Sequence, residues 1–284
     1  KQAGIKGYEK YIDCRELESY EDIKKAVKKY IIFGRVNPEQ KKQIIKALKE
    51  LGLKVAMTGD GVNDILAMKE SDCSIAIGSG ADAARETAQV VLLDSDFGNM
   101  RDIVYEGRKN INNITRSASL FTYKNIFSLL LSIYSIVFAM QYPLEPNQVS
   151  LGSAFTIGIP AFLLTFEENQ KKQQNGNFLK KVFKNSLPAA ITSFLVIVAM
   201  VRFSVLFNVS GQEITTACSY LFFTGGFLIL YKIIRPLNKY RSSVMALCIL
   251  GILLTINVMP DFFAIKAISE RAAALVTLFA IAEF

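Results

Sequence analysis

The pattern of apolar and polar positions divides the chain into two parts of different character near Arg116. Over residues 1–100, short apolar runs alternate with charged stretches of helical period, which is typical of an α/β domain with a parallel sheet. Beyond residue 117 the chain consists mainly of long apolar segments. The polar helical stretch 101–117 leads from one part into the other, and we expect it to form a stalk.

The first part carries start and stop signals for individual elements. Asn37 followed by Pro38 predicts the N-terminus of a helix, and Gly52 predicts its end. The pattern predicts helices at 21–29, 38–51 and 65–70, and strands at 31–33, 54–57 and 73–77.

The second part, 118–284, reads as an all-α bundle of membrane-spanning helices, because its apolar segments approach the length that crosses a bilayer. The sixth segment is shorter than the others. The predicted spans are 117–140, 149–166, 186–207, 214–234, 244–259 and 268–284.

Loop charge predicts how these spans are oriented. The connections 167–184 and 232–241 are rich in Lys and Arg, whereas 141–148 and 208–213 contain neither. By the positive-inside rule the first pair lies in the cytoplasm together with residues 1–117, in a multi-pass protein of the cell membrane. Lys266 and Arg271, in the last outer connection, depart from the rule.

Composition narrows the chemistry further. The chain has no histidine, which excludes histidine general bases and histidine metal ligands. Its four cysteines are far apart and suggest neither a disulfide framework nor a zinc site. The net charge of +8 comes largely from the basic membrane connections, so we do not expect a nucleic-acid partner.

One loop carries the pattern of a metal site. Residues 58–64 (Thr-Gly-Asp-Gly-Val-Asn-Asp) follow a predicted strand and precede a helix, where open α/β sheets place their ligands. Asp60 and Asp64 supply hard oxygen donors and Asn63 a neutral one, which suits Mg²⁺ bound together with a phosphate. Asp60-Gly61 taken alone is equally consistent with an ordinary turn.

Three motifs in order resemble the P-type ATPases, and in particular their cation-transporting, type II-like bacterial pumps. They are the 58–64 loop, the segment 33–41 (Phe-Gly-Arg-Val-Asn-Pro-Glu-Gln-Lys), and 93–97 (Leu-Asp-Ser-Asp-Phe) followed by 106–108 (Glu-Gly-Arg). The resemblance implies that 1–100 is the C-terminal part of a phosphorylation domain with a Rossmann-like, haloacid-dehalogenase-like α/β fold, and hence a partial domain. It also implies an ATP-driven pump that couples formation and hydrolysis of an aspartyl phosphate to ion transport.

The resemblance assigns roles to five residues. Asp60 and Asp64 hold Mg²⁺, Lys41 stabilises the charge of the phosphoryl group, and Arg35 and Asn63 help to place ATP; Lys41, Asp60, Asn63 and Asp64 form the catalytic set. Sequence alone leaves Lys41 open to another interpretation, as a solvated residue, because three further lysines share its helix.

The aspartate nucleophile of the family lies in an Asp-Lys-Thr-Gly-Thr string, and the chain contains no such string. The resemblance therefore implies a C-terminal portion whose partner is the missing N-terminal part of the same pump, with the nucleotide-binding domain and four helices. We expect this portion alone to be inactive. The alternative is a truncated, non-catalytic membrane module.

The first span, 117–140, carries candidate transport residues. Lys124 lies about 11 Å along the helix from Ser117. A charge at that depth in the membrane is costly and indicates a function. Alternatively, the long side chain reaches back to the interface between membrane and water. Asn125 aligns with a cation-ligating asparagine of calcium and sodium pumps. Ser128 shares its face, as an ion ligand or as a helix-helix hydrogen bond.

The next span contains Ser153, Thr156 and Pro160. Pro160 has no N–H to donate to the carbonyl of Thr156, which leaves that oxygen available to a cation. Ile157 occupies the position of an aspartate in calcium and sodium pumps. The missing carboxylate disfavours a high-affinity divalent site. The pattern nevertheless resembles most a group of bacterial cation pumps, some of which are linked with calcium, so we favour calcium as the cargo over protons, monovalent cations and Mg²⁺, and keep a lipid or polyamine cargo as a further alternative.

Overall fold

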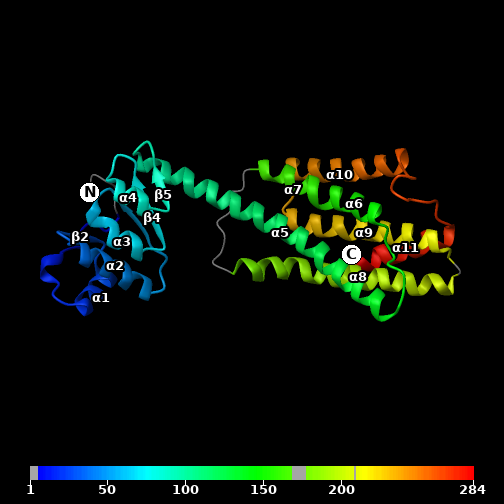
Figure 1. Cartoon of the computed structure of the whole chain (residues 1–284), viewed down its shortest axis with the longest axis horizontal. Coiled ribbons are helices and arrows are strands. Elements are labelled where there is room, and N and C mark those ends of the chain that lie inside the picture. The colour runs from blue at the N-terminus through cyan, green and yellow to red at the C-terminus, as the bar shows by residue number, and fades with distance from the viewer. Residues whose placement is uncertain (1–5, 168–176, 208) are drawn as a thin grey trace. The chain divides into compact units, whose positions relative to one another are not determined.

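The computed structural model describes residues 6–167, 177–207 and 209–284. The chain divides into two units, Lys1–Ile103 and Val104–Phe284. Figure 1 shows strands and short helices in the first unit and a bundle of long helices in the second. Residues 168–176, which belong to one of the basic connections, lie outside the described residues.

The first unit contains two parallel sheets. Their strands are β1 (Tyr11–Asp13), β2 (Ile32–Gly34), β3 (Ala56–Gly59), β4 (Cys73–Ile77) and β5 (Val90–Leu92). β1 pairs with β2, and β3, β4 and β5 form the second sheet with β4 in the middle. Every pair is parallel, which confirms the expected α/β class.

Each sheet is joined through helices whose ends follow local sequence rules. The helices are α1 (Tyr20–Lys29), α2 (Pro38–Glu50), α3 (Ile65–Glu70) and α4 (Asp82–Thr87). The side chain of Asn37 accepts a hydrogen bond from the Gln40 backbone and Pro38 occupies the first turn, which confirms the predicted start of α2. Met68, Ala76 and Ala84 form the core between α3, β4 and α4.

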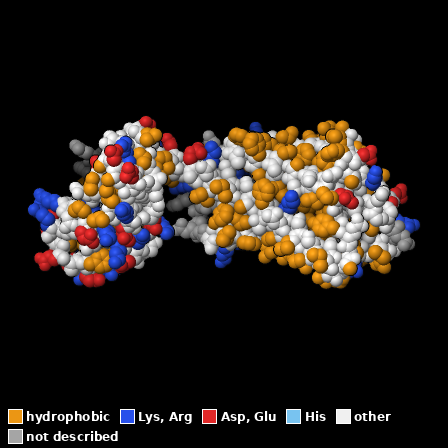
Figure 2. Space-filling view, viewed as in Figure 1, with side chains coloured by type: hydrophobic (Ala, Val, Ile, Leu, Met, Phe, Trp, Pro, Cys, Tyr) orange, Lys and Arg blue, Asp and Glu red, His pale blue; other side chains and the backbone are white. Residues whose placement is uncertain are grey.

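The second unit is a bundle of helices. They are α5 (Met100–Val137), α6 (Pro146–Ser153), α7 (Ile159–Leu163), α8 (Phe178–Leu206), α9 (Gly211–Ile234), α10 (Lys239–Val258) and α11 (Glu270–Glu283). Five helical segments of the described chain are long and apolar enough to cross a membrane. Figure 2 shows hydrophobic side chains spread over the surface of this unit, as lipid contact requires.

The sixth predicted span corresponds to α11, which at 14 residues is shorter than the roughly 20 that usually span a bilayer. It packs against α8 and α9 inside the bundle. α9 is the most buried of the five long apolar segments, and Figure 1 shows it in the middle of the bundle. α6, α8 and α11, which come from early and late parts of the second unit's sequence, all pack against α9.

Two glycines allow close approach to the α9 region. A Cβ at Gly226 would overlap Thr156, and a Cβ at Gly152 would overlap Phe222 and Phe223. Thr156 lies in a π-helical turn, Ala154–Gly158, between α6 and α7. The irregular turn precedes Pro160, which cannot continue the ordinary hydrogen-bond ladder.

Candidate functional site

The 58–64 loop lies at the carboxyl end of β3, as the sequence predicted. Gly59 ends the strand, a single 3₁₀ turn (Val62–Asp64) follows, and α3 begins at Ile65. Asp64 is 7% exposed, whereas Asp60 is exposed. The loop therefore presents one buried and one accessible carboxylate.

Lys41 contacts the buried carboxylate. Its Nζ donates to Oδ1 of Asp64 at 2.6 Å, from the first turn of α2. Two other lysines of this helix lie beside different partners: Lys42 is 3.9 Å from Glu39, and Lys49 donates to the carbonyl of Glu70. Among these three lysines, Lys41 is the one that contacts the loop, and its role at a phosphoryl group stays a prediction.

Close backbone packing fixes the two aspartates. The backbone N–H of Asp60 donates to Oδ2 of Asp64 at 3.3 Å, and the carbonyl of Asp60 accepts from the N–H of Ala81 at 2.8 Å. A Cβ at Gly59 would overlap the Asp64 side chain, and one at Gly80 would overlap the Asp60 carbonyl. Positions 59 and 80 therefore have no room for a side chain larger than that of glycine.

Arg35 and Asn63 are less closely tied to this centre. Arg35 follows β2 with a left-handed φ of 52°, and its guanidinium donates to Asp13 at 3.0 Å. Asn63 is exposed on the loop itself. Both side chains are accessible to a ligand, and their assignment to ATP stays a prediction.

The donor set fits Mg²⁺. Each carboxylate offers several lone pairs, and Asp64 keeps free ones after binding Lys41 and the Asp60 N–H. Mg²⁺ is commonly held by one or two carboxylates, with waters and substrate phosphate completing its coordination. No group of three His, Cys, Asp or Glu side chains that could hold a metal occurs among the described residues, so the two aspartates would need those additional ligands.

The structure separates the predicted transport residues of α5 from its buried face. Tyr123 and Phe127 are fully buried in the bundle, whereas Lys124 and Ser128 are half-buried and Asn125 is exposed. The side chain of Ser128 lies beside that of Tyr142. Asn125 thus lies on a side of α5 that the described chain does not cover, whereas Lys124 is partly covered.

The predicted residues of the next span lie deeper. Thr156 is 1% exposed and its hydroxyl donates to the carbonyl of Gly152 at 2.7 Å, while Ser153 donates to Val149 at 2.6 Å. Pro160 is buried at the start of α7. No hydrogen bond between these residues and Asn125 is found in the described chain, so the structure does not join the two predicted sets.

A buried ion cluster that the sequence did not predict closes one end of the bundle. Glu167 is 8% exposed and accepts hydrogen bonds from Arg241 at 2.7 Å, from Arg116 at 2.9 Å and from Asn238 at 2.8 Å. Burial acts to raise the pKa of Glu167, but the hydrogen bonds from Arg241, Asn238 and Arg116 outweigh it and the pKa is lowered. The sequence signal was limited to two arginines that flank apolar segments.

Comparison with known proteins identifies the family of the chain. The family of haloacid dehalogenase-like hydrolases matches residues 1–72, which include Lys41, Asp60 and Asp64. A protein of Streptococcus pneumoniae serotype 4, "Probable cation-transporting ATPase exp7", is 39% identical over 270 residues, 89% of this chain and 33% of that protein. The chain belongs to the P-type cation-transporting ATPase family. Its fold, an α/β unit followed by a helical membrane unit, is the one that the family predicts.

Two further P-type relatives are described as calcium-transporting ATPases. The protein CtpE of Mycolicibacterium smegmatis is 35% identical over 87% of this chain and 33% of its own length. A protein of Bacillus subtilis is 31% identical over 80% of this chain and 26% of its own length. The chain thus spans about a third of the length of the curated P-type relatives that it matches.

Proposed function

We propose that this chain is the C-terminal portion of an ATP-driven P-type cation pump, with Lys41, Asp60 and Asp64 at its phosphoryl-transfer centre. The observation that carries the proposal is the 2.6 Å contact between Lys41 Nζ and Asp64 Oδ1, which joins α2 to the β3 loop. Two motifs 23 residues apart, each identified separately from the sequence, meet there.

Each residue has a distinct task in this proposal. Asp60 and Asp64 hold Mg²⁺, which supplies positive charge to the transferring phosphoryl group. Lys41 adds a point cation, and its bond to Asp64 keeps the ammonium aimed at the loop. Arg35 and Asn63, both exposed, contact ATP. The aspartate that accepts the phosphoryl group belongs to the missing N-terminal part.

The proposed cargo is calcium. Calcium-transporting relatives of two genera support it, as does the irregular turn that carries the buried Thr156. Asn125 is exposed here, and helices from the missing part would cover that side of α5 to complete the site.

One observation favours a second candidate, a cargo that needs no membrane carboxylate. Ile157 is 1% exposed in the turn where calcium and sodium pumps place an aspartate. Lys124 adds a positive charge to the neighbouring span. A proton or a monovalent cation fits these two residues better than a divalent metal does, because it requires less negative charge from the membrane residues.

The test uses the full-length gene product in liposomes at fixed Mg²⁺. We expect Lys41→Met to lower kcat of ATP hydrolysis at least 100-fold, on the order of the loss of one transition-state charge partner. Lys42→Met is the matched control, because Lys42 lies on the same helix beside Glu39, and it should leave kcat unchanged. Equal loss in both variants would contradict the proposed site.

Cargo is tested in the same liposomes by titrating Ca²⁺, K⁺, Na⁺ and pH separately. Stimulation of ATP hydrolysis by micromolar Ca²⁺ that is lost in Asn125→Ala would support calcium. Hydrolysis that is indifferent to Ca²⁺ but depends on another ion would support the second candidate.

A further inference from the structure

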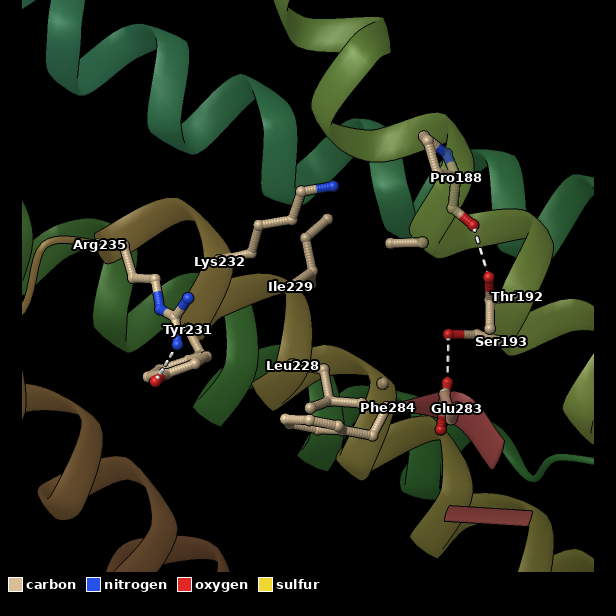
Figure 3. Close-up of a pocket in the computed structure, with 12 residues that line it drawn as sticks. Pro188, Thr192, Ser193, Leu228, Ile229, Tyr231, Lys232, Arg235, Glu283 and Phe284 are labelled. Carbon is tan, nitrogen blue, oxygen red and sulfur yellow. Dashed lines mark hydrogen bonds between the residues drawn. The ribbon is translucent and has the colours of Figure 1, made fainter. Parts of the chain in front are cut away.

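A carboxyl group lies inside the membrane unit at the end of α11, outside every site described above. Glu283 is 9% exposed, and its Oε1 accepts a hydrogen bond from the hydroxyl of Ser193 on α8 at 2.5 Å. The Ser193 hydroxyl is in turn 2.9 Å from the hydroxyl of Tyr123 on α5. Figure 3 shows Ser193 and Glu283 pointing toward one another across the gap between their helices.

The second oxygen of this carboxyl group has no partner. Within the described residues, Oε2 of Glu283 is buried and makes no hydrogen bond. A buried carboxylate oxygen without a partner is costly, and the cost is removed when that oxygen binds a positively charged ligand or a proton. Oε2 of Glu283 is therefore a candidate position for binding a proton or a cation.

A glycine on α9 makes room for the cluster. A Cβ placed on Gly225 would overlap Glu283 Oε1 and Ser193 Oγ and would come within 2.7 Å of the Tyr123 hydroxyl. Three oxygens from three helices thus converge on a bare stretch of α9. Any side chain at position 225 would occupy the space that they share.

The cluster opens onto a cavity of about 320 Å³. Its charged or titratable side chains, apart from Glu283 itself, are Tyr231 and Lys232 of α9 and Arg235, which directly follows α9; α8 contributes the hydroxyl of Thr192. The Arg235 guanidinium lies 4.3 Å from the centre of the Tyr231 ring. Figure 3 shows these two side chains beside one another, and in the described structure no ion pair joins Glu283 to Arg235 or Lys232. The carboxyl group thus borders a cavity lined by both apolar and polar side chains, and this cavity is the route by which a proton would arrive.

The chemistry of the cluster favours a proton over a metal ion. One carboxylate with two hydroxyls is a poor donor set for a divalent metal, and the cavity lining already holds two cations. Ser193 donates to the carboxylate, whereas a metal ligand would have to direct a lone pair at the ion. The 2.5 Å separation of Ser193 Oγ and Glu283 Oε1 is that of a hydrogen bond to a charged acceptor.

We propose that Glu283, with Ser193, Tyr123 and Gly225, forms a proton-binding site of the membrane unit, in which Oε2 takes up and releases a proton through the adjoining cavity. In the charged form the Ser193 hydroxyl stabilises Oε1. In the neutral form the added proton neutralises Oε2 while the same hydrogen bond remains. The site requires only the bundle itself and does not depend on the proposed ATPase chemistry or cargo.

The test is pH-dependent infrared difference spectroscopy of the full-length gene product in nanodiscs. We expect a protonated-carboxyl band that titrates in the unaltered protein, is lost in Glu283→Gln and persists in Glu270→Gln. Glu270 is the matched control because it lies on the same helix and is exposed. Ser193→Ala should move the midpoint of that band upward by about 1 pH unit, since the charged form loses a hydrogen bond.

Two results would overturn the proposal. One is a spectrum in which Glu283→Gln removes no titrating band over the pH range in which the protein stays folded. The other is a band that Na⁺, K⁺ or Ca²⁺ abolishes at constant pH in the unaltered protein, which would identify a metal site. Ser193→Ala gives a second reading if Glu283→Gln fails to fold, because an unmoved midpoint also contradicts the assignment.

Discussion

Replacing Glu167 by Gln should destabilise the membrane unit more than any exposed substitution, because it leaves two buried guanidinium groups without their anion. The side chains of Arg241 and Arg116 are 7% and 12% exposed, so water screens neither of them well. Removing one partner of a buried ion pair costs about 3–5 kcal/mol. For a unit of this size each kcal/mol lowers Tm by roughly 2–4 °C, so we expect a fall of roughly 6–20 °C.

The assay is thermal unfolding of the solubilised full-length gene product, followed with a thiol-reactive fluorophore. Cys218 and Cys248 are buried in the bundle and become reactive when it opens. Arg116→Met should lower Tm less than Arg241→Met, because Arg241 also donates to two backbone carbonyls. Glu270→Gln is the control. A Glu167→Gln shift no larger than that of the control would refute the reasoning.

The same cluster gives a pH dependence with a defined sign. The pKa of Glu167 is lowered in the folded state from its usual value of 4.5. Its contribution to stability is therefore present above that value and is lost as the pH falls through the folded-state pKa. The difference in Tm between the unaltered protein and Glu167→Gln should shrink in acid.

Three further substitutions test the packing of the two units. Asn37→Ala removes the cap of α2 and should cost about 1 kcal/mol, measured by urea unfolding of the full-length gene product. Gly80→Ala overlaps the carbonyl of Asp60 and should raise the Mg²⁺ concentration for half-maximal ATP hydrolysis several-fold, with little effect if Asp60 does not bind the metal. Gly226→Ala places a methyl group against Thr156, and overpacking of this kind costs about 1–3 kcal/mol. In the thiol assay we therefore expect the Tm of the membrane unit to fall by roughly 2–12 °C.

Local signals were sufficient for most of the α/β unit. The Asn37-Pro38 pair and the apolar runs before 34, 58 and 78 placed α2, β2, β3 and β4, because caps and short strands depend on neighbouring residues. β1 and β5, three residues each, were not predicted. β1 contains only two apolar residues and does not stand out in the pattern, whereas the run 90–93 is as apolar as that of β2 and could have been predicted.

Long-range contacts could not be predicted in the same way. Glu167 meets partners 51 and 74 residues away, and Glu283 meets Ser193 at a separation of 90. The spacing of apolar residues along one helix does not indicate which polar residue of another helix it will contact. The spacing of Asn125 and Ser128 predicted a shared face, but the bundle buries the face of Tyr123 and Phe127 instead. The roles of Asn125 and Ser128 stay predictions.

The two adjacent glycines of α9 have a consequence for how the membrane unit responds to movement. Gly225 lies against the oxygens of Tyr123, Ser193 and Glu283, and Gly226 lies against Thr156. Successive helical residues point about 100° apart, so one short stretch of backbone forms a wall of both polar centres. A rotation of α9 about its own axis would move Gly225 and Gly226 together. The space around Glu283 would widen as the space around Thr156 narrowed, so the two centres would change in opposite directions.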